Sequence, residues 1–414
     1  KRLGKVYTPR PIVERIYAEM GLTAAQLLDR NLLDPACGDG RFLVVLVEHI
    51  LAELPETEQP RALENLHGWD LDEEALAECR ANLDALVADR PYTVQWKLRH
   101  TNALRALGGA FSFDFVVGNP PYIRIQHLDT TDRTFIQQHY TLCRKGAMDA
   151  YLAFIELADS LLTERGCCGF ITPNSFLSSE AGEGLRSFWK QTKRLRCLLN
   201  FGAVQVFEKA STYAAITVFG KGAQGESFGY GLANEDQTFR MRAIRWDELH
   251  DKGPWRLSTE LIQLEAGGRR LGDICQISVG ISTLCDAVYI VKKAEEGADD
   301  TTLFRTRDQQ LVRLEKELLR PIVKASKLKT ADQEIDEWVI FPYELCENGR
   351  HRILPEEHLR TAYPLAYHYL MSQKDQLDKR DNGKPNLVAW YAFGRSQALD
   401  SGFGSKIVFS PINK

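Results

Sequence analysis

The 414-residue sequence lacks the features that mark membrane-spanning or zinc-dependent proteins. Its nine cysteines form no Cys-x-x-Cys pair, which argues against a zinc site and fits reduced thiols in a cytoplasm. The most apolar helical stretch, "AYLAFIELADSLL", carries Glu156 and Asp159, so we expect no membrane-spanning segment. Internal repeats and low-complexity tracts are also missing from the sequence. We therefore expect a globular protein that binds no metal ion.

Three elements of common catalytic chemistry are missing as well. There is no Pro-Cys dipeptide, which argues against methylation of cytosine C5 by a cysteine nucleophile. There is no Gly-x-Ser-x-Gly elbow for a serine hydrolase. No lysine follows an acidic residue by two positions, so a metal nuclease of the common kind would have to lie outside this chain. Because the net charge is −4, any basic surface that binds nucleic acid must be confined to one part of the molecule.

The order of segments predicts two domains, because the chain is too long for one ordinary core. Strand-like and helix-like segments alternate through the first half, which indicates an α/β fold with a doubly wound, mostly parallel, Rossmann-like sheet. A glycine-rich stretch at 220–231 is the expected boundary, which gives domains at 1–235 and 236–414. In the second, α+β domain we expect strands at 274–282, 287–293 and 337–344, and helices at 311–319 and 366–379.

Both ends of the sequence bear on its completeness. The chain begins with Lys1 rather than Met and ends on the strand-like run "KIVFSPINK". We therefore expect a fragment of a longer polypeptide, with the second domain truncated at its C-terminus.

A glycine loop follows one of the predicted strands. In "LLDPACGDGRFL" (32–43), a Gly-x-Gly pair stands between a strand and a helix, where backbone can approach a ligand. The third glycine of a dinucleotide fingerprint is replaced by Leu43, so a plain strand-to-helix turn is the alternative for this pair. Asp70 ends the next predicted strand and could accept hydrogen bonds from ribose hydroxyls, although a plain strand end or helix cap is the alternative. Together the two loops indicate a nucleoside-bearing cofactor with an uncharged or cationic centre.

Two consecutive prolines follow another apolar strand in "DFVVGNPPYIRIQ" (114–126). Each proline fixes its own φ and pushes the preceding residue into an extended conformation, so Asn119 and Pro120 are held rigidly. The side-chain carbonyl of Asn119 and the main-chain carbonyl of Pro120 could each accept from one N–H of an exocyclic amino group. This would localise the lone pair of that amine for attack. Tyr122 could stack on the base, and a tight turn with a packed tyrosine is the alternative.

In this order, the motifs resemble those of S-adenosylmethionine-dependent N6-adenine DNA methyltransferases of bacterial restriction-modification systems, in their gamma-class arrangement. The resemblance covers nearly the whole chain, with counterparts for "GKVYTP" (4–9), "DPACGDGRFL", Asp70, "GNPPY", "AMDAYLAFIELADSLL", "GCCGFITPNSFL" and "VQVFEKAST" (204–212). It implies the catalytic residues Asn119, Pro120, Pro121, Tyr122 and Phe207. It implies a cofactor site made by Tyr7, Thr8, Pro9, Asp34, Ala36, Cys37, Gly38, Gly40, Phe42, Asp70, Leu71, Asn102 and Asn119.

Two of these positions carry an alternative or a departure. The resemblance implies that Phe207 packs on the second face of the target base, and a place in the core is the alternative. Asn102, in "RHTNALRAL", stands where relatives have an Asp that contacts the adenine of the cofactor. An amide oxygen can still accept from the adenine amino group, but the negative charge is lost.

The implied enzyme moves the methyl group of S-adenosylmethionine to N6 of an adenine that is flipped out of duplex DNA. We expect it to act as a monomer on a specific site in a bacterial or archaeal cytoplasm, with a cognate restriction endonuclease as a possible partner. Two alternatives stay open: an RNA or protein-glutamine methyltransferase with the same site, and a catalytically silent DNA-specificity module.

The region after residue 231 favours DNA, because it is long enough for a target-recognition domain and carries basic residues that suit phosphate contacts. For any single lysine, a solvated surface is the alternative. These residues are Arg320, Lys324, Lys327, Lys329, Lys374, Lys379, Arg380, Lys384, Arg395, Lys406 and Lys414, with Trp390, Tyr391 and Phe393 near the last of them.

Overall fold

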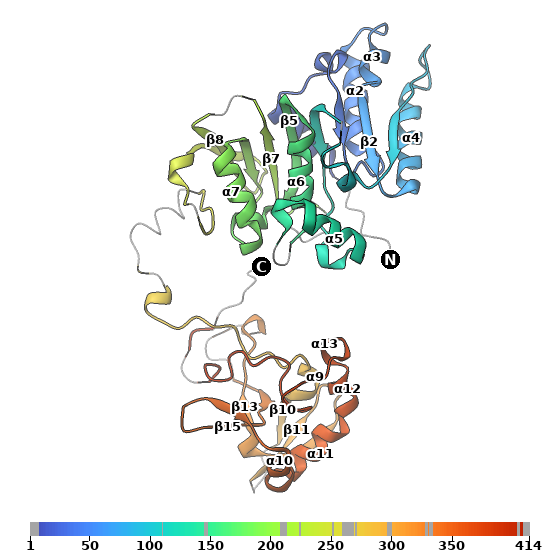
Figure 1. Ribbon diagram of the computed structural model, residues 1–414. Helices are drawn as coiled ribbons and strands as arrows, with labels where there is room; N and C mark the ends of the chain where they lie inside the picture. The colour runs from blue at the N-terminus through green and yellow to red at the C-terminus, as the bar shows by residue number, and fades with distance from the viewer. Residues whose placement is uncertain are drawn as a thin grey trace. The chain divides into compact units, whose positions relative to one another are not determined.

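The computed structural model describes residues 8–408 with these gaps: 110, 145–147, 208–212, 223–224, 251, 259–268, 270, 296–299, 328–329, 331–333 and 404–405. The chain divides into two compact units, Lys1–Gly268 and Arg269–Lys414 (Figure 1). Within the described residues no helix has both the length and the apolar character to cross a membrane.

A nine-stranded sheet forms the centre of the first unit. Its spatial order is β3-β2-β1-β4-β5-β7-β6-β8-β9. Strands β3, β2, β1, β4 and β5 run parallel to their neighbours, whereas β7 is antiparallel to β5 and β6. The strands are β1 (Leu32–Asp34), β2 (Leu66–Asp70), β3 (Lys97–His100), β4 (Phe113–Gly118), β5 (Leu162–Pro173), β6 (Leu195–Asn200), β7 (Ala214–Gly220), β8 (Ser227–Ala233) and β9 (Phe239–Arg245).

Helices cover both faces of this sheet. Along β4, Phe115 and Val117 belong to one buried cluster while Val116 belongs to another, which explains why the strand is a continuous apolar run. The cluster of Phe115 also contains the buried faces of α1 (Arg10–Met20), α2 (Arg41–Glu53) and α4 (Glu73–Val87). The cluster of Val116 contains those of α5 (Thr130–His139), α6 (Ala150–Leu161) and α7 (Glu183–Thr192). The predicted α/β architecture is confirmed.

The boundary between the units differs from the prediction of 235/236. The glycine-rich stretch at 220–231 contains most of β8, and β9 follows it, so both strands extend the first sheet. β8 pairs with β6 in parallel and β9 pairs with β8 in antiparallel register. The glycine content predicted a domain boundary here. Gly231 instead lies within the sheet against Met241 and Leu199, and the side chains of these two residues leave no room for a Cβ. The first unit therefore continues to Gly268.

The second unit has a five-stranded sheet of order β12-β11-β10-β14-β13 and a two-stranded sheet β15-β16. Its strands are β10 (Ile290–Glu295), β11 (Thr301–Arg305), β12 (Leu311–Glu315), β13 (Leu319–Pro321), β14 (Glu337–Ile340), β15 (Tyr343–Leu345) and β16 (His351–Ile353). Its helices are α9 (Asp286–Tyr289), α10 (Glu356–Ala362), α11 (Pro364–Ser372), α12 (Lys374–Asp378) and α13 (Arg380–Gly383).

Two predictions in this unit are wrong. The expected helix at 311–319 is the strand β12 followed by a 3₁₀ turn and β13, because Leu314 is buried while Leu311 and Arg313 are exposed in a two-residue period. The expected strand at 274–282 is not formed in the described residues, where Ile274, Ile277 and Val279 are exposed. The expected helix at 366–379 is confirmed as α11 and α12.

Candidate active site

The site residues meet at one edge of the first sheet. β1 lies between β2 and β4, and all three run in the same direction, so their carboxyl ends lie side by side. The order of strands reverses at β1, which makes a switch point of the kind that binds ligands in open α/β sheets. The glycine loop follows β1, Asp70 ends β2 and Asn119 follows β4.

The glycine loop after β1 needs its glycines. Gly38 and Gly40 have φ of 55° and 86°, a region that residues with a Cβ avoid. A Cβ on Gly40 would also lie 2.6 Å from Sγ of Cys79 on α4. The backbone N–H of Gly38 donates to Oδ2 of Asp70 over 2.8 Å, so Asp70 ties its own loop to the glycine loop. The other Asp70 oxygen accepts from the backbone N–H of Asp72 over 2.9 Å, and each oxygen keeps a second lone pair for a ligand.

Asp34 lies under the same loops and is buried. Its Oδ1 accepts from the backbone N–H of Ala36 over 3.0 Å. A Cβ on Gly118 would approach that oxygen to 2.7 Å, so only glycine allows the loop that leads to Asn119 to pass over it. Burial raises the pKa of Asp34 to about 8, and the nearby Asp70 adds to the shift. This edge therefore holds a carboxyl group whose charge changes near neutral pH.

The side-chain amide of Asn119 has a partner at its nitrogen and none at its oxygen among the described residues. Its Nδ2 donates to Oγ1 of buried Thr8 over 3.1 Å, which joins the start of the chain to the catalytic loop. Its Oδ1 is buried and accepts no hydrogen bond from the described residues. A buried carbonyl without a donor is costly, so this atom is poised for a donor supplied by a ligand.

Tyr122 and Phe207 lie together, but not as the two parallel faces of a base sandwich. Their ring centroids are 6.2 Å apart and the planes meet at 69°, an edge-to-face arrangement. Phe207 is 2% exposed and belongs to the buried cluster that also contains the residues of α1 and α2. The hydroxyl of Tyr122 donates to the carbonyl of Ile171 over 3.3 Å, and burial raises the pKa of Tyr122. In this structure Phe207 has the core position that was the alternative.

The other predicted cofactor residues differ in what they can offer. The side chains of Cys37 and Phe42 are buried in the core, so only their backbone can face a cofactor. Leu71 is 61% exposed beside Asp70, and Ala36 is partly buried. Thr8 and Pro9 immediately precede α1, and Tyr7 lies outside the described residues.

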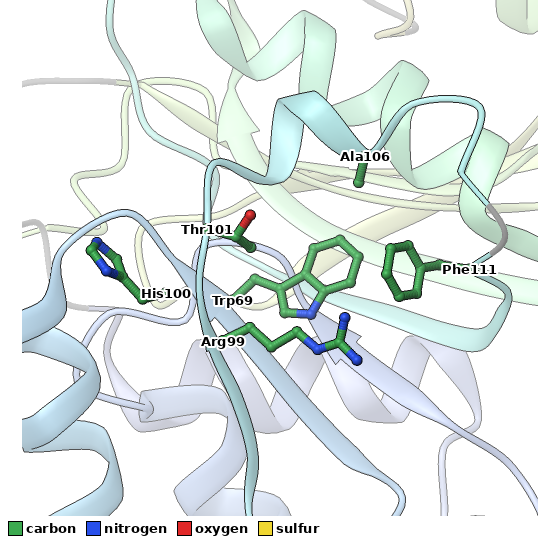
Figure 2. A pocket seen from close by; sticks show the side chains of 6 residues that line it. All are labelled: Trp69, Arg99, His100, Thr101, Ala106 and Phe111. Atoms are coloured by element: carbon green, nitrogen blue, oxygen red, sulfur yellow. The ribbon is translucent and has the colours of Figure 1, made fainter.

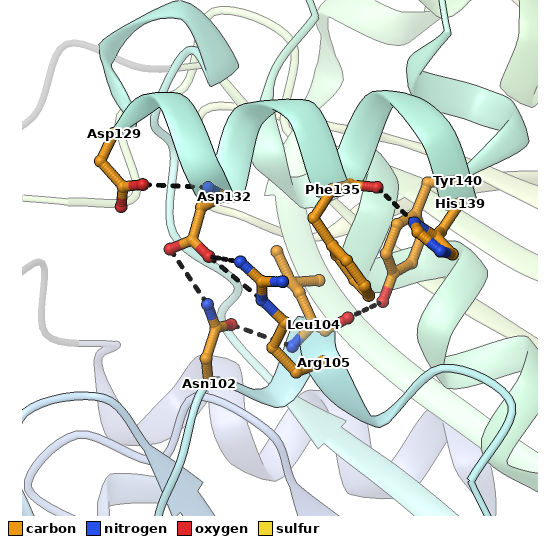
Figure 3. A network of polar contacts seen from close by, with 8 residues as sticks. All are labelled: Asn102, Leu104, Arg105, Asp129, Asp132, Phe135, His139 and Tyr140. Carbon is orange, nitrogen blue, oxygen red and sulfur yellow. Dashed lines mark hydrogen bonds and ion pairs between the residues drawn. The ribbon is translucent and has the colours of Figure 1, made fainter.

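Asn102 is the N-cap of the 3₁₀ helix η2 (Ala103–Ala106). Figure 3 shows its amide between the backbone N–H of Leu104 and the carboxylate of Asp132. Asp132 belongs to α5 and lies 30 residues from Asn102 in the chain, so its contact with this predicted site residue could not be foreseen from the sequence. Its only local signal is the sequence Asp-Thr-Thr-Asp at the start of that helix.

A separate hollow of about 360 Å³ opens beside η2 and the edge strand β3. Figure 2 shows its lining of Trp69, Arg99, His100, Thr101, Ala106 and Phe111. None of the predicted site residues lines it. The guanidinium of Arg99 lies 5.1 Å from the ring centre of Phe111. Burial, with the charges of Lys97 and Arg99, lowers the pKa of the neighbouring His67 to about 4. The predicted site residues therefore lie at the loop edge, outside the lining of this hollow.

Comparison with known proteins finds one matching family and several related sequences. Residues 55–207 match the family of the Eco57I restriction-modification methylase. The chain is 28% identical over 318 residues to the Type II restriction enzyme and methyltransferase RM.Eco57I of Escherichia coli, a match that covers 70% of this chain and 31% of that protein. It is 25% identical over 441 residues to the Type II methyltransferase M.BstVI of Geobacillus stearothermophilus, covering 94% of this chain and 73% of that protein.

Two further matches are more limited, one in its coverage of the chain and one in its sequence identity. A release factor glutamine methyltransferase of Caulobacter vibrioides is 33% identical over 157 residues, which cover 38% of this chain and 49% of that protein. The solved structure of the Type IIL restriction-modification enzyme MmeI in complex with DNA resembles this chain with a TM-score of 0.53 at 13% identity, covering 90% of this chain and 53% of that one. At that identity the likeness concerns the fold.

The fold and the site agree with the class of enzyme that the sequence resemblance implies, the methyltransferases that bind S-adenosylmethionine. The residues present fit this cofactor, since a glycine loop, an acidic strand end and the unpartnered carbonyl of Asn119 share that edge. Over residues 55–207 the chain is similar to the Eco57I restriction-modification methylase family, and over most of its length it is similar to Type II methyltransferases.

Proposed function

We propose that the chain transfers the methyl group of S-adenosylmethionine to N6 of an adenine that is rotated out of duplex DNA. One observation carries this proposal. Oδ1 of Asn119 is a buried acceptor with no donor among the described residues, and the bond from Nδ2 to Thr8 fixes the direction in which it points. An amino group carried by the substrate would supply the missing donor.

The chemistry of the amine explains why two acceptors are needed. The lone pair of an exocyclic amino group is delocalised into the base, which makes the group a poor nucleophile. The carbonyls of Asn119 and Pro120 would each take one N–H and so localise the lone pair on nitrogen. The prolines hold both acceptors in place before the substrate arrives, so little reorganisation is needed during the reaction. No general base is required, because the proton can pass to water after transfer.

The cofactor would be held by the loops that surround Asn119. The backbone of Gly38 and Gly40 would allow its close approach, and the free lone pairs of Asp70 would accept from the ribose hydroxyls. Thr8 and Pro9 would flank the site from the start of α1. Bound S-adenosylmethionine supplies an electrophilic methyl group on a sulfonium.

Access to Asn119 requires a base outside the helix, because an adenine amino group inside a duplex is paired and stacked. Tyr122 would stack on the extruded base. A second stacking face from Phe207 would require its ring to leave the edge-to-face contact with Tyr122 and its core position. Stacking of a base on an aromatic ring is worth about 1–3 kcal/mol, which would help offset extrusion.

The second unit, together with the part of the chain after about residue 240, is the proposed target-recognition region. Fewer of its basic residues are available for phosphate contacts than the sequence suggested. Arg380 is buried and donates to the carbonyls of Leu377, Trp390 and Ala392, while Tyr391 and Phe393 lie in the core. Lys324, Lys327, Lys374 and Arg395 form ion pairs with carboxylates. Lys379 and Lys384 form no ion pair among the described residues and are better candidates for phosphate contacts.

The RNA and protein-glutamine alternatives remain tied to the same site, because an amide nitrogen presents the same chemical problem as a base amine. The length of the second unit favours DNA over these substrates, and a cognate restriction endonuclease is a proposed partner. An enzyme that acts on its DNA site as a monomer is part of the same proposal.

Methyl transfer to mixed substrates tests the proposal directly. The full chain is incubated with S-adenosylmethionine labelled on the methyl group and with duplex DNA, RNA or a glutamine-bearing protein, and the labelled product is digested and identified. We expect N6-methyladenine from DNA alone, and no product from Asn119→Ala. Label on cytosine, RNA or glutamine would contradict the substrate assignment, and the absence of transfer to every substrate would favour a silent specificity module.

A further inference from the structure

The hollow beside η2 lies on the other face of the sheet from the glycine loop. Asp70 uses its side chain to bond Gly38 of that loop, whereas the side chain of the preceding residue, Trp69, lies in the buried cluster of α5, α6 and α7. Successive residues of a strand point to opposite faces, so the hollow is separate from these contacts of the candidate active site. Its volume of about 360 Å³ lies within the range of small-molecule sites.

A buried donor without a partner lies in the wall of the hollow. The side chain of Trp69 is 1% exposed, and its Nε1 makes no hydrogen bond among the described residues. The rings of Phe111 and Phe113 meet the indole edge to face, with centroids 5.1 and 5.8 Å away. Figure 2 shows the indole beside Phe111, with its nitrogen on the side of Arg99. A buried N–H without a partner is costly, so an acceptor carried by a ligand would be stabilised here.

The same face carries two cations on the edge strand β3. In the parallel register Trp69 lies opposite Arg99, and His67 lies opposite Lys97. Both cations are exposed, and neither forms an ion pair within the part of the chain that the structure describes. Burial, together with these two charges, lowers the pKa of His67 to about 4, so its ring is neutral at neutral pH. None of the described residues that line the hollow is acidic. An anion is therefore favoured at this face.

The lining indicates the chemistry of that anion. The indole N–H of Trp69 and the guanidinium of Arg99 only donate, so their partner must carry acceptor oxygens, as a phosphate does. The ring of Phe111 is 39% exposed and offers apolar surface to a planar group. Because the guanidinium of Arg99 lies 5.1 Å from the centre of this ring, the phosphate and the base of one nucleotide can reach both groups.

We propose that the hollow binds a nucleotide, whose phosphate accepts from Trp69 and Arg99 and whose base packs on Phe111. The nucleotide is either free or part of a DNA strand, since both sources carry the same phosphate and base.

Calorimetry with guanosine monophosphate on the full chain tests this inference. Guanosine and inorganic phosphate are the matched probes, because each carries one half of the nucleotide. The nucleotide should bind about tenfold or more tightly than either half, because only the nucleotide uses both the donors and the ring. Each titration is repeated with saturating S-adenosylhomocysteine, which should leave the affinity for guanosine monophosphate unchanged.

Two variants remove the proposed phosphate contacts one at a time. Trp69→Phe removes the indole N–H but keeps an aromatic ring against Phe113, and Arg99→Gln removes a charge from an exposed position. Each should weaken the binding of guanosine monophosphate by about tenfold, the value of one charge-assisted hydrogen bond. Thermal unfolding reports the stability of both. Arg99→Gln keeps the test decisive if the loss of the buried indole disturbs the fold.

Arg80→Gln is the matched control. Arg80 is an exposed arginine of α4, and the buried residues of that helix belong to the cluster on the other face of the sheet. This variant should bind guanosine monophosphate as the wild type does.

A fluorescent single-stranded oligonucleotide distinguishes the two sources of the nucleotide. If Trp69→Phe and Arg99→Gln weaken its binding as they weaken that of guanosine monophosphate, the hollow takes a nucleotide within a strand. If they weaken only the binding of guanosine monophosphate, the hollow takes a free nucleotide.

The inference is overturned if the wild type binds no guanosine monophosphate at millimolar concentration, or if inorganic phosphate binds as tightly as the nucleotide. Unchanged affinity in both Trp69→Phe and Arg99→Gln would overturn it as well. Displacement by S-adenosylhomocysteine would place the nucleotide at the loop edge instead. Equal weakening by Arg80→Gln and Arg99→Gln would reduce the effect to a general attraction between charges.

Discussion

The loop edge of the first unit and the basic residues of the second unit hold their polar groups in opposite ways. At the loop edge, Asn119 keeps a buried carbonyl oxygen without a donor among the described residues, and Asp70 keeps lone pairs free beyond its two backbone contacts. In the second unit, Arg380 is saturated by backbone carbonyls and Lys324 is paired with Asp286. An unpartnered acceptor that lies beside the glycine loop and Asp70 therefore indicates a ligand site better than a count of charges in the sequence does.

The largest expected effect follows from the unpartnered oxygen of Asn119. Asn119→Ala should lower the rate of methyl transfer by about 10²–10³, since one pre-organised acceptor is removed. The dissociation constant for S-adenosylhomocysteine should change little, because the glycine loop and Asp70 remain. Single-turnover kinetics and calorimetry measure the two quantities. A variant that keeps half of the wild-type rate would rule out the proposed role.

The parts predicted from sequence share a physical basis. The strands β1 and β2 and the helix α2 were predicted because short apolar runs and a longer apolar segment flank a glycine loop that has a strict backbone requirement at Gly40. The boundary at 235/236 and the helix at 311–319 failed because glycine content and short apolar runs do not reveal which strand will pair with which. The contact between Asn102 and Asp132 was not predicted because the two residues are 30 positions apart in the chain.

Asp34 gives a prediction that depends on pH. The pKa of this carboxyl is about 8 in the native state and 3.8 for an ordinary aspartate, with burial as the main cause. The native state therefore holds the proton more tightly. This contribution to stability is complete below pH 3.8 and is lost as pH rises through about 8, with a slope of at most about 1.4 kcal/mol per pH unit. Asp34→Asn removes the titration.

Urea unfolding of both proteins between about pH 4 and pH 9 tests this. The free energy of unfolding of Asp34→Asn relative to wild type should rise with pH up to about 8 and then level off. A difference that stays constant across the range would show that Asp34 is not protonated in the native state.

Arg380 tests whether the buried cation of the second unit serves stability and not DNA binding. Because its guanidinium is buried and serves several carbonyls, Arg380→Ala should destabilise the second unit by roughly 3 kcal/mol or more. Lys379→Ala, at the adjacent exposed position, is the control and should leave stability within about 0.5 kcal/mol of wild type. Thermal unfolding measures both. If Arg380→Ala were as stable as the wild type and lost only DNA affinity, Arg380 would contact phosphate, as the sequence suggested.

Asp70 should affect the cofactor more than the DNA. Asp70→Ala removes both the proposed ribose acceptor and the tie to the N–H of Gly38. The dissociation constant for S-adenosylhomocysteine should rise about tenfold or more, since hydrogen bonds to a charged group are worth about 1.5–3 kcal/mol. Calorimetry gives the affinity, and DNA binding at matched salt is the control. Unchanged cofactor affinity would mean that the ribose does not contact Asp70 at the end of β2.

The smallest effect belongs to single exposed cations of the second unit, and it distinguishes a phosphate contact from a solvated surface. Lys384 forms no ion pair among the described residues, whereas Nζ of Lys374 is 2.7 Å from Oδ2 of Asp378. If Lys384 contacts a phosphate, Lys384→Ala should reduce the slope of log affinity against log salt by about one and weaken specific and random duplexes alike. Lys374→Ala should change the slope less, because its charge is already offset by Asp378. Titration of fluorescent duplexes at several salt concentrations measures both slopes. Equal and negligible changes would mean that the cations near residue 380 face solvent, and the DNA-reading surface would have to be sought elsewhere in this unit.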